Sequence, residues 1–470
     1  VDQTRLYVNP ACVCLGLQDQ DQEHAPCEVE LFLPDELKHF QIATGLPSKS
    51  LVKGRFTLKG DNYDQLIDSP FELAEQSRFS FEANGIPHEF VISGQHNTNL
   101  ERLKTDIEKI CQTEINMFGS APFQNYTFMT MATGNSYGGL EHCNSTSLIT
   151  PRDDLPKADE AEEPSKDYQR FLGLCSHEYF HSWLVKFIRP ENFANYDLQK
   201  EGYTSLLWIF EGFTSYYDDL ILLRSGVISQ TSYLELLKAQ IDRYLQNPGR
   251  AIQSVSESSF DAWIKFYRQD ENSNNAGTSY YNKGSLVALC LDLGLRLRGS
   301  SLDAVMRRLY ENAQQGIQVN ERTIFDLCQE LTSDNWVEQI NHLIYTTDEL
   351  PLDQLLPEFG LSYVLKNEKS LPFGLKAVDK ADGVVIQQVR RDSAAARAGL
   401  SAQDVIIAID GLKASEKLLA QYAKQQGAFT MYTFRRDELM QFEVQGGENP
   451  LSTVDLKVED QSKLENWLNI

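Results

Sequence analysis

The feature that most constrains the fold is a pair of histidines, His177 and His181, set four residues apart in the apolar stretch LCSHEYFHSWL. Residues four apart lie on one face of an α-helix, so two imidazoles with this spacing can reach one metal ion. Glu178, the next residue along, is placed to act as a base on water at that ion. The apolar flanks predict a buried helix. The alternative is that both histidines are core residues with ordinary hydrogen-bond partners.

A catalytic zinc ion usually has three protein ligands and one open position, so the histidine pair needs a further partner. Two glutamates downstream are candidates. Glu211 lies in the apolar, helix-like run LWIFEGFT, whereas Glu201 follows Gln199 and Lys200 in a more polar context. The context favours Glu211 and leaves Glu201 open. For either residue the alternative is a surface carboxylate with no ligand role.

Composition limits the partners that the chain can have. The 470 residues are 41% hydrophobic and carry a formal net charge of −24. A chain of this length predicts two to four domains. Proteins that bind nucleic acid carry clustered Lys and Arg, and an acidic chain is also repelled by anionic membrane surfaces. We therefore expect neither nucleic acid nor membrane as a partner.

The eight cysteines are scattered and form no C-x-x-C pair. Several of them, such as Cys290 in LVALCLDL, stand in apolar runs, which is typical of reduced, buried thiols. No apolar run approaches the ~20 residues of a membrane span. These features predict a cytoplasmic protein. The chain begins at Val1 without Met, so an export signal before it stays open.

The order of local patterns predicts a multidomain α+β protein. Residues 1–95 contain alternating and β-branched runs and are expected to form an N-terminal β domain. Residues 96–365 become mostly helical, as in GSLVALCLDLGLRLRG, and are expected to form the catalytic domain with a helical extension. Residues 366–450 return to short strands and indicate a separate small domain. Residues 451–470 are expected to be a C-terminal tail.

A second group of candidate residues lies in the hexapeptide YGGLEH, at 137–142, just after a predicted strand. Gly138 and Gly139 would let a substrate backbone approach closely. Glu141 offers a carboxylate that can pair with a free α-ammonium group. Two glycines before a glutamate are by themselves more often a turn, so this interpretation depends on the metal motif nearby.

A tyrosine further along the chain is a candidate for stabilising negative charge. Tyr281 begins the sequence YNKG, and a phenol can donate a hydrogen bond to the oxyanion of a tetrahedral intermediate. The alternative is a tyrosine buried in the core, which suits the neighbouring Tyr280 better.

The run HEYFHSWLVKFIRP, followed by LWIFEGFTSYYDDL, closely resembles the bacterial glycyl aminopeptidase family. Its members are gluzincin peptidases related to aminopeptidase N, with a thermolysin-like catalytic domain and a PDZ domain near the C-terminus. The resemblance implies one zinc ion per chain and Glu211 as its third ligand. It also implies that Glu141, in the motif that ends at His142, binds the substrate's N-terminus and that Tyr281 contacts the oxyanion.

Residues 372–375, with the sequence PFGL, resemble the carboxylate-binding loop of PDZ domains, and GVVIQQV, DSAAARAGL and DVIIAIDG follow in the order of that fold. PDZ domains bind extended peptides by strand addition and hold the C-terminal carboxylate with backbone N–H groups. This domain can bind a peptide C-terminus or only pack on the catalytic domain. The resemblance also implies a longer N-terminal β domain, so we expect part of it to precede Val1.

Together these patterns predict a zinc-dependent aminopeptidase that releases small residues, Gly or Ala, from peptides with a free N-terminus. The size preference is implied by the resemblance alone. Two other functions stay open. One is a PDZ-bearing peptide-binding scaffold with a structural or inactive metal site, although such a site needs no base like Glu178. The other is a zinc endopeptidase, in which Glu141 would not meet a free amine.

Overall fold

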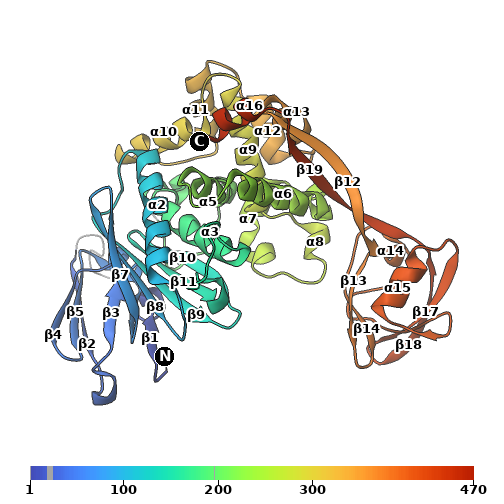
Figure 1. Ribbon diagram of the computed structural model, residues 1–470, viewed down its shortest axis with the longest axis horizontal. Helices are drawn as coiled ribbons and strands as arrows, with labels where there is room; N and C mark the ends of the chain where they lie inside the picture. The colour runs from blue at the N-terminus through green and yellow to red at the C-terminus, as the bar shows by residue number, and fades with distance from the viewer. Residues whose placement is uncertain (1, 18–24, 195, 470) are drawn as a thin grey trace.

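The computed structural model of the chain describes residues 2–17, 25–194 and 196–469. A β region at the N-terminus, a helical middle and a second β region near the C-terminus follow one another along the chain (Figure 1). The predicted multidomain α+β fold is therefore confirmed. None of the helices in these described ranges combines the length and the apolar character needed to cross a bilayer.

The N-terminal region consists of two small antiparallel sheets, with strand orders β1-β6-β3 and β2-β5-β4. Leu58 and Leu73, one from each sheet, are fully buried in a shared apolar cluster, so the two sheets pack on each other. The elements are β1 (Arg5–Val8), η1 (Pro10–Cys12), β2 (Cys27–Phe32), η2 (Asp35–Leu37), β3 (Gln41–Thr44), β4 (Ser48–Val52), β5 (Arg55–Gly60), α1 (Tyr63–Ile67) and β6 (Phe71–Ala74).

A five-stranded mixed sheet, ordered β10-β11-β9-β8-β7, lies next along the chain. Its elements are β7 (Ser77–Ala83), β8 (Ile86–Ser93), α2 (Leu100–Phe118), β9 (Tyr126–Thr133), β10 (Gly138–Glu141), β11 (Ser145–Pro151), η3 (Arg152–Asp154) and the covering helix α3 (Lys166–Phe180). Residues 77–93 were expected in the N-terminal β domain, but β8 pairs in parallel with β9 instead. A local strand pattern does not reveal its partner, because pairing depends on which faces can be buried together.

One buried histidine sits in this sheet. His88 on β8 is 2% exposed. Its Nδ1 lies 2.8 Å from the carbonyl of Ile86 and its Nε2 lies 2.8 Å from the hydroxyl of Tyr179. Nδ1 must donate to the carbonyl, so in the neutral ring Nε2 accepts from the tyrosine. Burial lowers the pKa of His88 to about 4.

The middle region is mostly helical and shares one large apolar cluster with the mixed sheet. Residues 282–295 of α9 are all buried, so this helix forms the centre of the region. The elements are η4 (Glu191–Phe193), α4 (Leu207–Phe210), α5 (Gly212–Arg224), α6 (Gln230–Gln246), η5 (Pro248–Ala251), α7 (Val255–Phe260), the π-helix η6 (Ala262–Phe266), α8 (Ser273–Ala276), α9 (Asn282–Arg296), α10 (Leu302–Gln314), α11 (Thr323–Thr332), α12 (Val337–Tyr345) and α13 (Leu352–Glu358).

The C-terminal β region has an apolar core of its own, between Phe373 and Val444. Its sheet follows the order β13-β14-β15-β17-β18, with β16 paired to β15. The elements are β13 (Leu375–Lys380), β14 (Gly383–Val389), α14 (Ala394–Ala398), β15 (Val405–Ile409), β16 (Leu412–Lys413), α15 (Glu416–Ala423), β17 (Ala428–Arg435) and β18 (Glu438–Gln445).

A two-stranded antiparallel ribbon joins this region to the helical middle (Figure 1). Its strands are β12 (Leu361–Pro372) and β19 (Glu448–Val458), and α16 (Gln461–Leu468) follows. Residues 451–470 were expected to be a tail, and this prediction is wrong for the part that is described. Leu464 and Trp467 of α16 are buried in the main apolar cluster, which makes the segment an ordered part of the middle region. Such burial stabilises a short helix that would be marginal alone.

Candidate metal centre and active site

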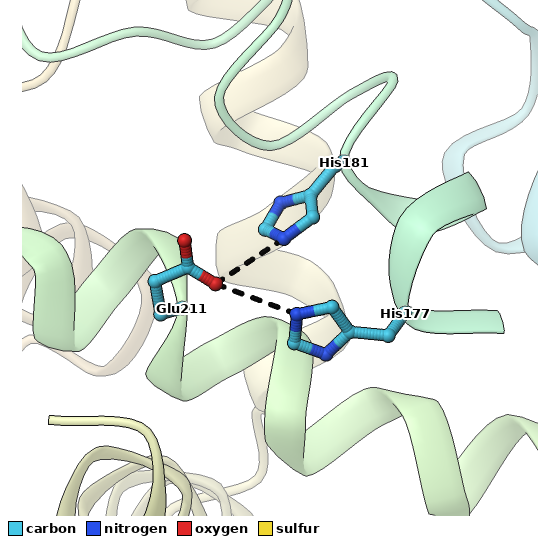
Figure 2. Close-up of side chains that lie close together, drawn as sticks. All are labelled: His177, His181 and Glu211. Carbon is cyan, nitrogen blue, oxygen red and sulfur yellow. Dashed lines mark ion pairs between the residues drawn. The ribbon is translucent and has the colours of Figure 1, made fainter. Parts of the chain in front are cut away.

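Helix α3 carries His177, and the second histidine of the predicted metal motif directly follows the helix. The hydroxyl of Ser165 accepts a hydrogen bond from the backbone N–H of Tyr168 and caps the start of the helix, and His181 is the residue at its end. The Nε2 atoms of His177 and His181 lie 3.4 Å and 3.2 Å from the same oxygen, Oε2 of Glu211 (Figure 2). The helical spacing of four therefore places both rings on one side of α3, as predicted.

Glu211 reaches the histidines from the junction between α4 and α5. The next residue, Gly212, packs directly on Gly284 of α9, and a Cβ at Gly212 would lie 2.6 Å from the Cα of Gly284. Both positions need glycine because no side chain fits between the two backbones. This contact joins the sequences EG and YNKG and brings Glu211 and Tyr281 to the same place. Glu201 lies in an exposed irregular stretch and is not part of the cluster.

The remaining ring nitrogens are held by hydrogen bonds that orient the histidines. Nδ1 of His177 lies 3.0 Å from Oδ2 of Asp218, and Nδ1 of His181 lies 2.9 Å from the carbonyl oxygen of Leu184. Metal-binding histidines typically make such bonds, which fix the tautomer with Nε2 free. Asp218 was not among the residues predicted from the sequence. Its spacing, seven residues after Glu211 and so two turns further along α5, is the signal that could have found it.

The three facing atoms fit a metal ion. One atom each from His177, His181 and Glu211 all lie within 4.8 Å of one another. Oε2 of Glu211 is buried and, among the described residues, makes no hydrogen bond, even though both imidazoles approach it. Burial opposes ionisation of this carboxyl, but the two imidazoles outweigh it and hold the pKa of Glu211 well below its usual range. Two imidazoles and a carboxylate are a donor set that suits Zn²⁺.

Glu178 lies in the same buried space and has no ligand role in this geometry. The residue is 5% exposed, and its Oε2 has no hydrogen-bond partner within the part of the chain that is described. Burial raises the pKa of Glu178 to about 7, opposed by the two nearby histidines and assisted by the charge of Glu141. A carboxyl group with this pKa can both accept and release a proton near neutral pH.

Strand β10, which carries the GGLE segment, passes directly over Glu178. A Cβ at Gly139 would lie 2.2 Å from Oε1 of Glu178, so only glycine allows the strand to approach the carboxylate. Gly138 has no such constraint, because its nearest neighbour would be Ile149 Cγ2 at 3.9 Å. Gly139 is therefore needed for the close packing of β10 on Glu178, which the sequence alone did not indicate.

Glu141 and His142 lie at the end of β10, beside an ion pair from two distant parts of the chain. Nζ of Lys186 lies 2.7 Å from Oδ1 of Asp68, and the backbone N–H of Cys143 donates to Oδ2 of Asp68 at 2.8 Å. Burial lowers the pKa of Lys186, but Asp68 and Glu141 together outweigh it and raise that pKa. Glu141 is therefore within the field of a partly buried cation.

His142 itself is 4% exposed, and neither ring nitrogen has a hydrogen bond among the described residues. Its Nδ1 lies 3.5 Å from Oδ1 of Asp68 and makes no hydrogen bond to it. Asp68 and Lys186 were not predicted from the sequence, and no local pattern marks either one, because they stand 118 positions apart.

Tyr281 faces the metal centre from the start of α9. Its ring centre lies 6.2 Å from that of His177, and its hydroxyl lies 3.2 Å from the hydroxyl of Tyr267. Burial, together with the charge of Glu211, raises the pKa of Tyr281, so the phenol keeps its proton. Tyr280 is 1% exposed and packs in the core, as the sequence indicated.

Three family models match the chain. Residues 170–287 match the M61 glycyl aminopeptidase family, residues 1–75 match the peptidase M61 N-terminal domain, and residues 371–442 match the PDZ domain. None of the curated proteins compared with the chain matches it significantly.

The chain is also similar to solved structures. One is the crystal structure of an aminopeptidase N family protein from Idiomarina loihiensis, with 40% identity, a TM-score of 0.93 and coverage of 100% of this chain and 83% of that chain. An M1 zinc metallopeptidase from Deinococcus radiodurans is much more distant, with 13% identity, a TM-score of 0.47 and coverage of 72% of this chain and 68% of that chain. A similarity as weak as the second says nothing about chemistry. The family models and the first of these structures together show that the chain belongs to the M61 glycyl aminopeptidase family, a family of peptidases.

Proposed function

We propose that this protein is a zinc-dependent aminopeptidase that releases small N-terminal residues, Gly or Ala, from peptides with a free N-terminus. The observation that carries the proposal is the convergence of His177, His181 and Glu211 in one largely buried place, with Glu178 beside them. The preference for a small residue is supported by the description of the family, glycyl aminopeptidase.

The residues around the metal centre have complementary tasks in this proposal. Bound by His177, His181 and Glu211, Zn²⁺ would polarise the scissile carbonyl and lower the pKa of water. Glu178 accepts the proton that the attacking water loses, and later passes it to the leaving amine. Its buried position beside the metal centre, where burial raises the pKa of the carboxyl group, supports this double role.

Two further groups act on the substrate itself. Tyr281 retains its proton and can donate a hydrogen bond to the carbonyl oxygen as that oxygen gains negative charge. Glu141 pairs with the substrate's α-ammonium group, and this contact makes the enzyme an exopeptidase. The backbone of Gly138 and Gly139 and the ring of His142 border the same end of the site.

The PDZ domain suggests a second contact with peptides. In its predicted carboxylate loop, the N–H of Phe373 donates to the carbonyl of Gly447 at 2.9 Å and the N–H of Gly374 donates to the carbonyl of Leu371 at 3.0 Å. A C-terminal carboxylate would have to replace both of these bonds. We therefore propose that this domain mainly supports the catalytic region, which fluorescence anisotropy with labelled C-terminal peptides would test.

Metal analysis combined with two matched substrate classes tests the main proposal. We expect one zinc ion per chain, loss of activity with a chelator and recovery when Zn²⁺ is added back. Free Gly and Ala amides should be hydrolysed, whereas their N-acetylated forms should not. Faster cleavage of N-acetylated peptides would favour an endopeptidase. Bound zinc without cleavage of either class would favour a binding scaffold.

A further inference from the structure

A group of large apolar side chains is exposed beside the candidate active site. Tyr203 lies in the loop before α4, and the others come from α7, η6 and the residue after it. The exposed fractions run from 39% for Tyr203 to 64% for Tyr267, and the five residues, here called the aromatic patch, are Tyr203, Phe260, Trp263, Ile264 and Tyr267. Contiguous exposed apolar surface on a protein usually marks a binding site.

The members of the patch are linked by one direct contact, by contacts with neighbouring residues and by their closeness in the chain. The rings of Tyr203 and Phe260 lie 5.4 Å apart. The indole N–H of Trp263 donates to the carbonyl of Gly202 at 3.2 Å and joins η6 to the same loop. At the other end, Tyr267 reaches the hydroxyl of Tyr281. The patch therefore extends from the proposed oxyanion tyrosine outward along the surface.

The base of the patch is anchored in the core. Ala262 and Ser259 are each 2% exposed, and the hydroxyl of Ser259 accepts a hydrogen bond from the backbone of Trp208 at 3.0 Å. Residues 262–266 form a π-helix, closed by the bond from the N–H of Tyr267 to the carbonyl of Ala262. Such π-helical turns are rare and frequently occur at functional sites. The apolar side chains are therefore presented to solvent from a firmly packed support.

The two ends of the candidate site differ in character. Beside Glu141 lie His142, which is buried, and the ion pair of Lys186 with Asp68, whose side chains are 20% and 23% exposed. At the Tyr281 end, Tyr267 is exposed and leads to the aromatic patch. A peptide whose N-terminus is held at Glu141 therefore extends past the metal centre and leaves the site over the patch.

We propose that the aromatic patch binds the residues that follow the scissile bond and selects peptides with large apolar side chains there. The proposal rests on the proposed aminopeptidase function, because only a substrate fixed at Glu141 has a defined direction across the site. Flat aromatic side chains give a large apolar contact area and lose little conformational freedom on binding. The enzyme thus prefers substrates in which a small N-terminal residue is followed by large apolar residues.

Three substrates with the same first residue test the proposal: Ala amide, Ala-Ser-Ser amide and Ala-Leu-Phe amide. We expect the unmodified enzyme to have at least tenfold higher kcat/KM for Ala-Leu-Phe amide than for Ala-Ser-Ser amide. Trp263→Ala and Phe260→Ala should remove most of this preference by raising KM, and leave hydrolysis of Ala amide unchanged. Leu439→Ala, which alters a side chain 62% exposed on β18 in the PDZ region, is the matched control and should change nothing.

Each other outcome has a defined meaning. Normal cleavage of Ala amide without the preference for Ala-Leu-Phe amide would overturn the patch proposal and leave the proposed function intact. An equal loss of kcat/KM on all three substrates in Trp263→Ala would assign the patch a structural role, and this result would also overturn the patch proposal. Dimers that dissociate in Trp263→Ala, with substrate preference unchanged, would assign the patch to a second copy of the chain. No cleavage of any of the three by the unmodified enzyme would overturn the proposed function, and this proposal with it.

Discussion

Replacing Gly139 with alanine changes the distance between β10 and Glu178 and alters no proposed catalytic side chain. A Cβ at this position would lie 2.2 Å from Oε1, 2.4 Å from Cδ and 2.6 Å from Cγ of Glu178. Ordinary contacts between such atoms begin near ~3.4 Å, so the carboxyl group must move by about 1 Å. Glu178 is 5% exposed and cannot simply turn into solvent.

The expected effect follows from this displacement. A catalytic group misplaced by about 1 Å can cost on the order of 100-fold in rate, or ~2.7 kcal/mol in activation free energy. We therefore expect kcat of Gly139→Ala on Ala amide to fall by about 100-fold, with bound zinc unchanged. Steady-state kinetics measures kcat, atomic absorption measures bound zinc, and thermal melting measures the stability of the fold. Gly138→Ala is the matched control, because a Cβ there meets nothing closer than 3.9 Å and should leave kcat almost unchanged.

The comparison of the two variants can refute the reasoning. If Gly139→Ala turned over substrate as fast as Gly138→Ala, the approach of β10 would not position Glu178. If Gly139→Ala lost zinc or melted far below the unmodified protein, the effect would belong to the metal centre or to the fold and not to the proposed base.

The remaining predictions concern the metal centre, substrate selection and acid stability. Glu178→Gln should keep zinc and lose activity, and normal turnover in a zinc-loaded variant would contradict its role as base. Glu211→Ala should lose zinc in a metal titration, whereas Glu201→Ala should keep it; the reverse result would reassign the third ligand. Glu141→Gln should lower kcat/KM on free Ala amide by at least tenfold, since loss of a buried charge partner costs ~2–5 kcal/mol, and equal losses on N-acetylated substrates would refute a role in amine binding. The pKa of His88 is about 4 in the folded protein, against an ordinary value of 6.5, so protonation favours the unfolded chain. The contribution of His88 to the free energy of unfolding is complete above pH 6.5 and should be lost as the pH falls through 4, by up to ~3 kcal/mol. The urea midpoint should therefore decrease less between pH 7 and pH 4.5 in His88→Gln than in the unmodified protein. Equal decreases in the two proteins would contradict a role of His88 in the acid-dependent loss of stability.

Short-range patterns in the sequence were enough to find the central residues of the candidate site. The spacing of His177 and His181 determines that both rings share a face of α3, because helical geometry depends on neighbouring residues alone. The apolar, helix-like run around Glu211 likewise favoured this residue as the third ligand, although the junction between α4 and α5 at Glu211 was not predicted. The distinction between Tyr280 and Tyr281 also followed from the local motif, and the structure places Tyr281 toward His177.

The tertiary structure decided what surrounds these residues. The contact of Gly212 with Gly284 joins two motifs that are 72 positions apart, which neither motif alone predicts. Asp68 reaches Lys186 only because the N-terminal region packs beside β10. The same holds for β8, which pairs with β9, and for α16, which is buried in the main cluster. Periodicity along the chain tells which face of an element is apolar, but the partner that buries this face is chosen by the free energy of the whole packed fold.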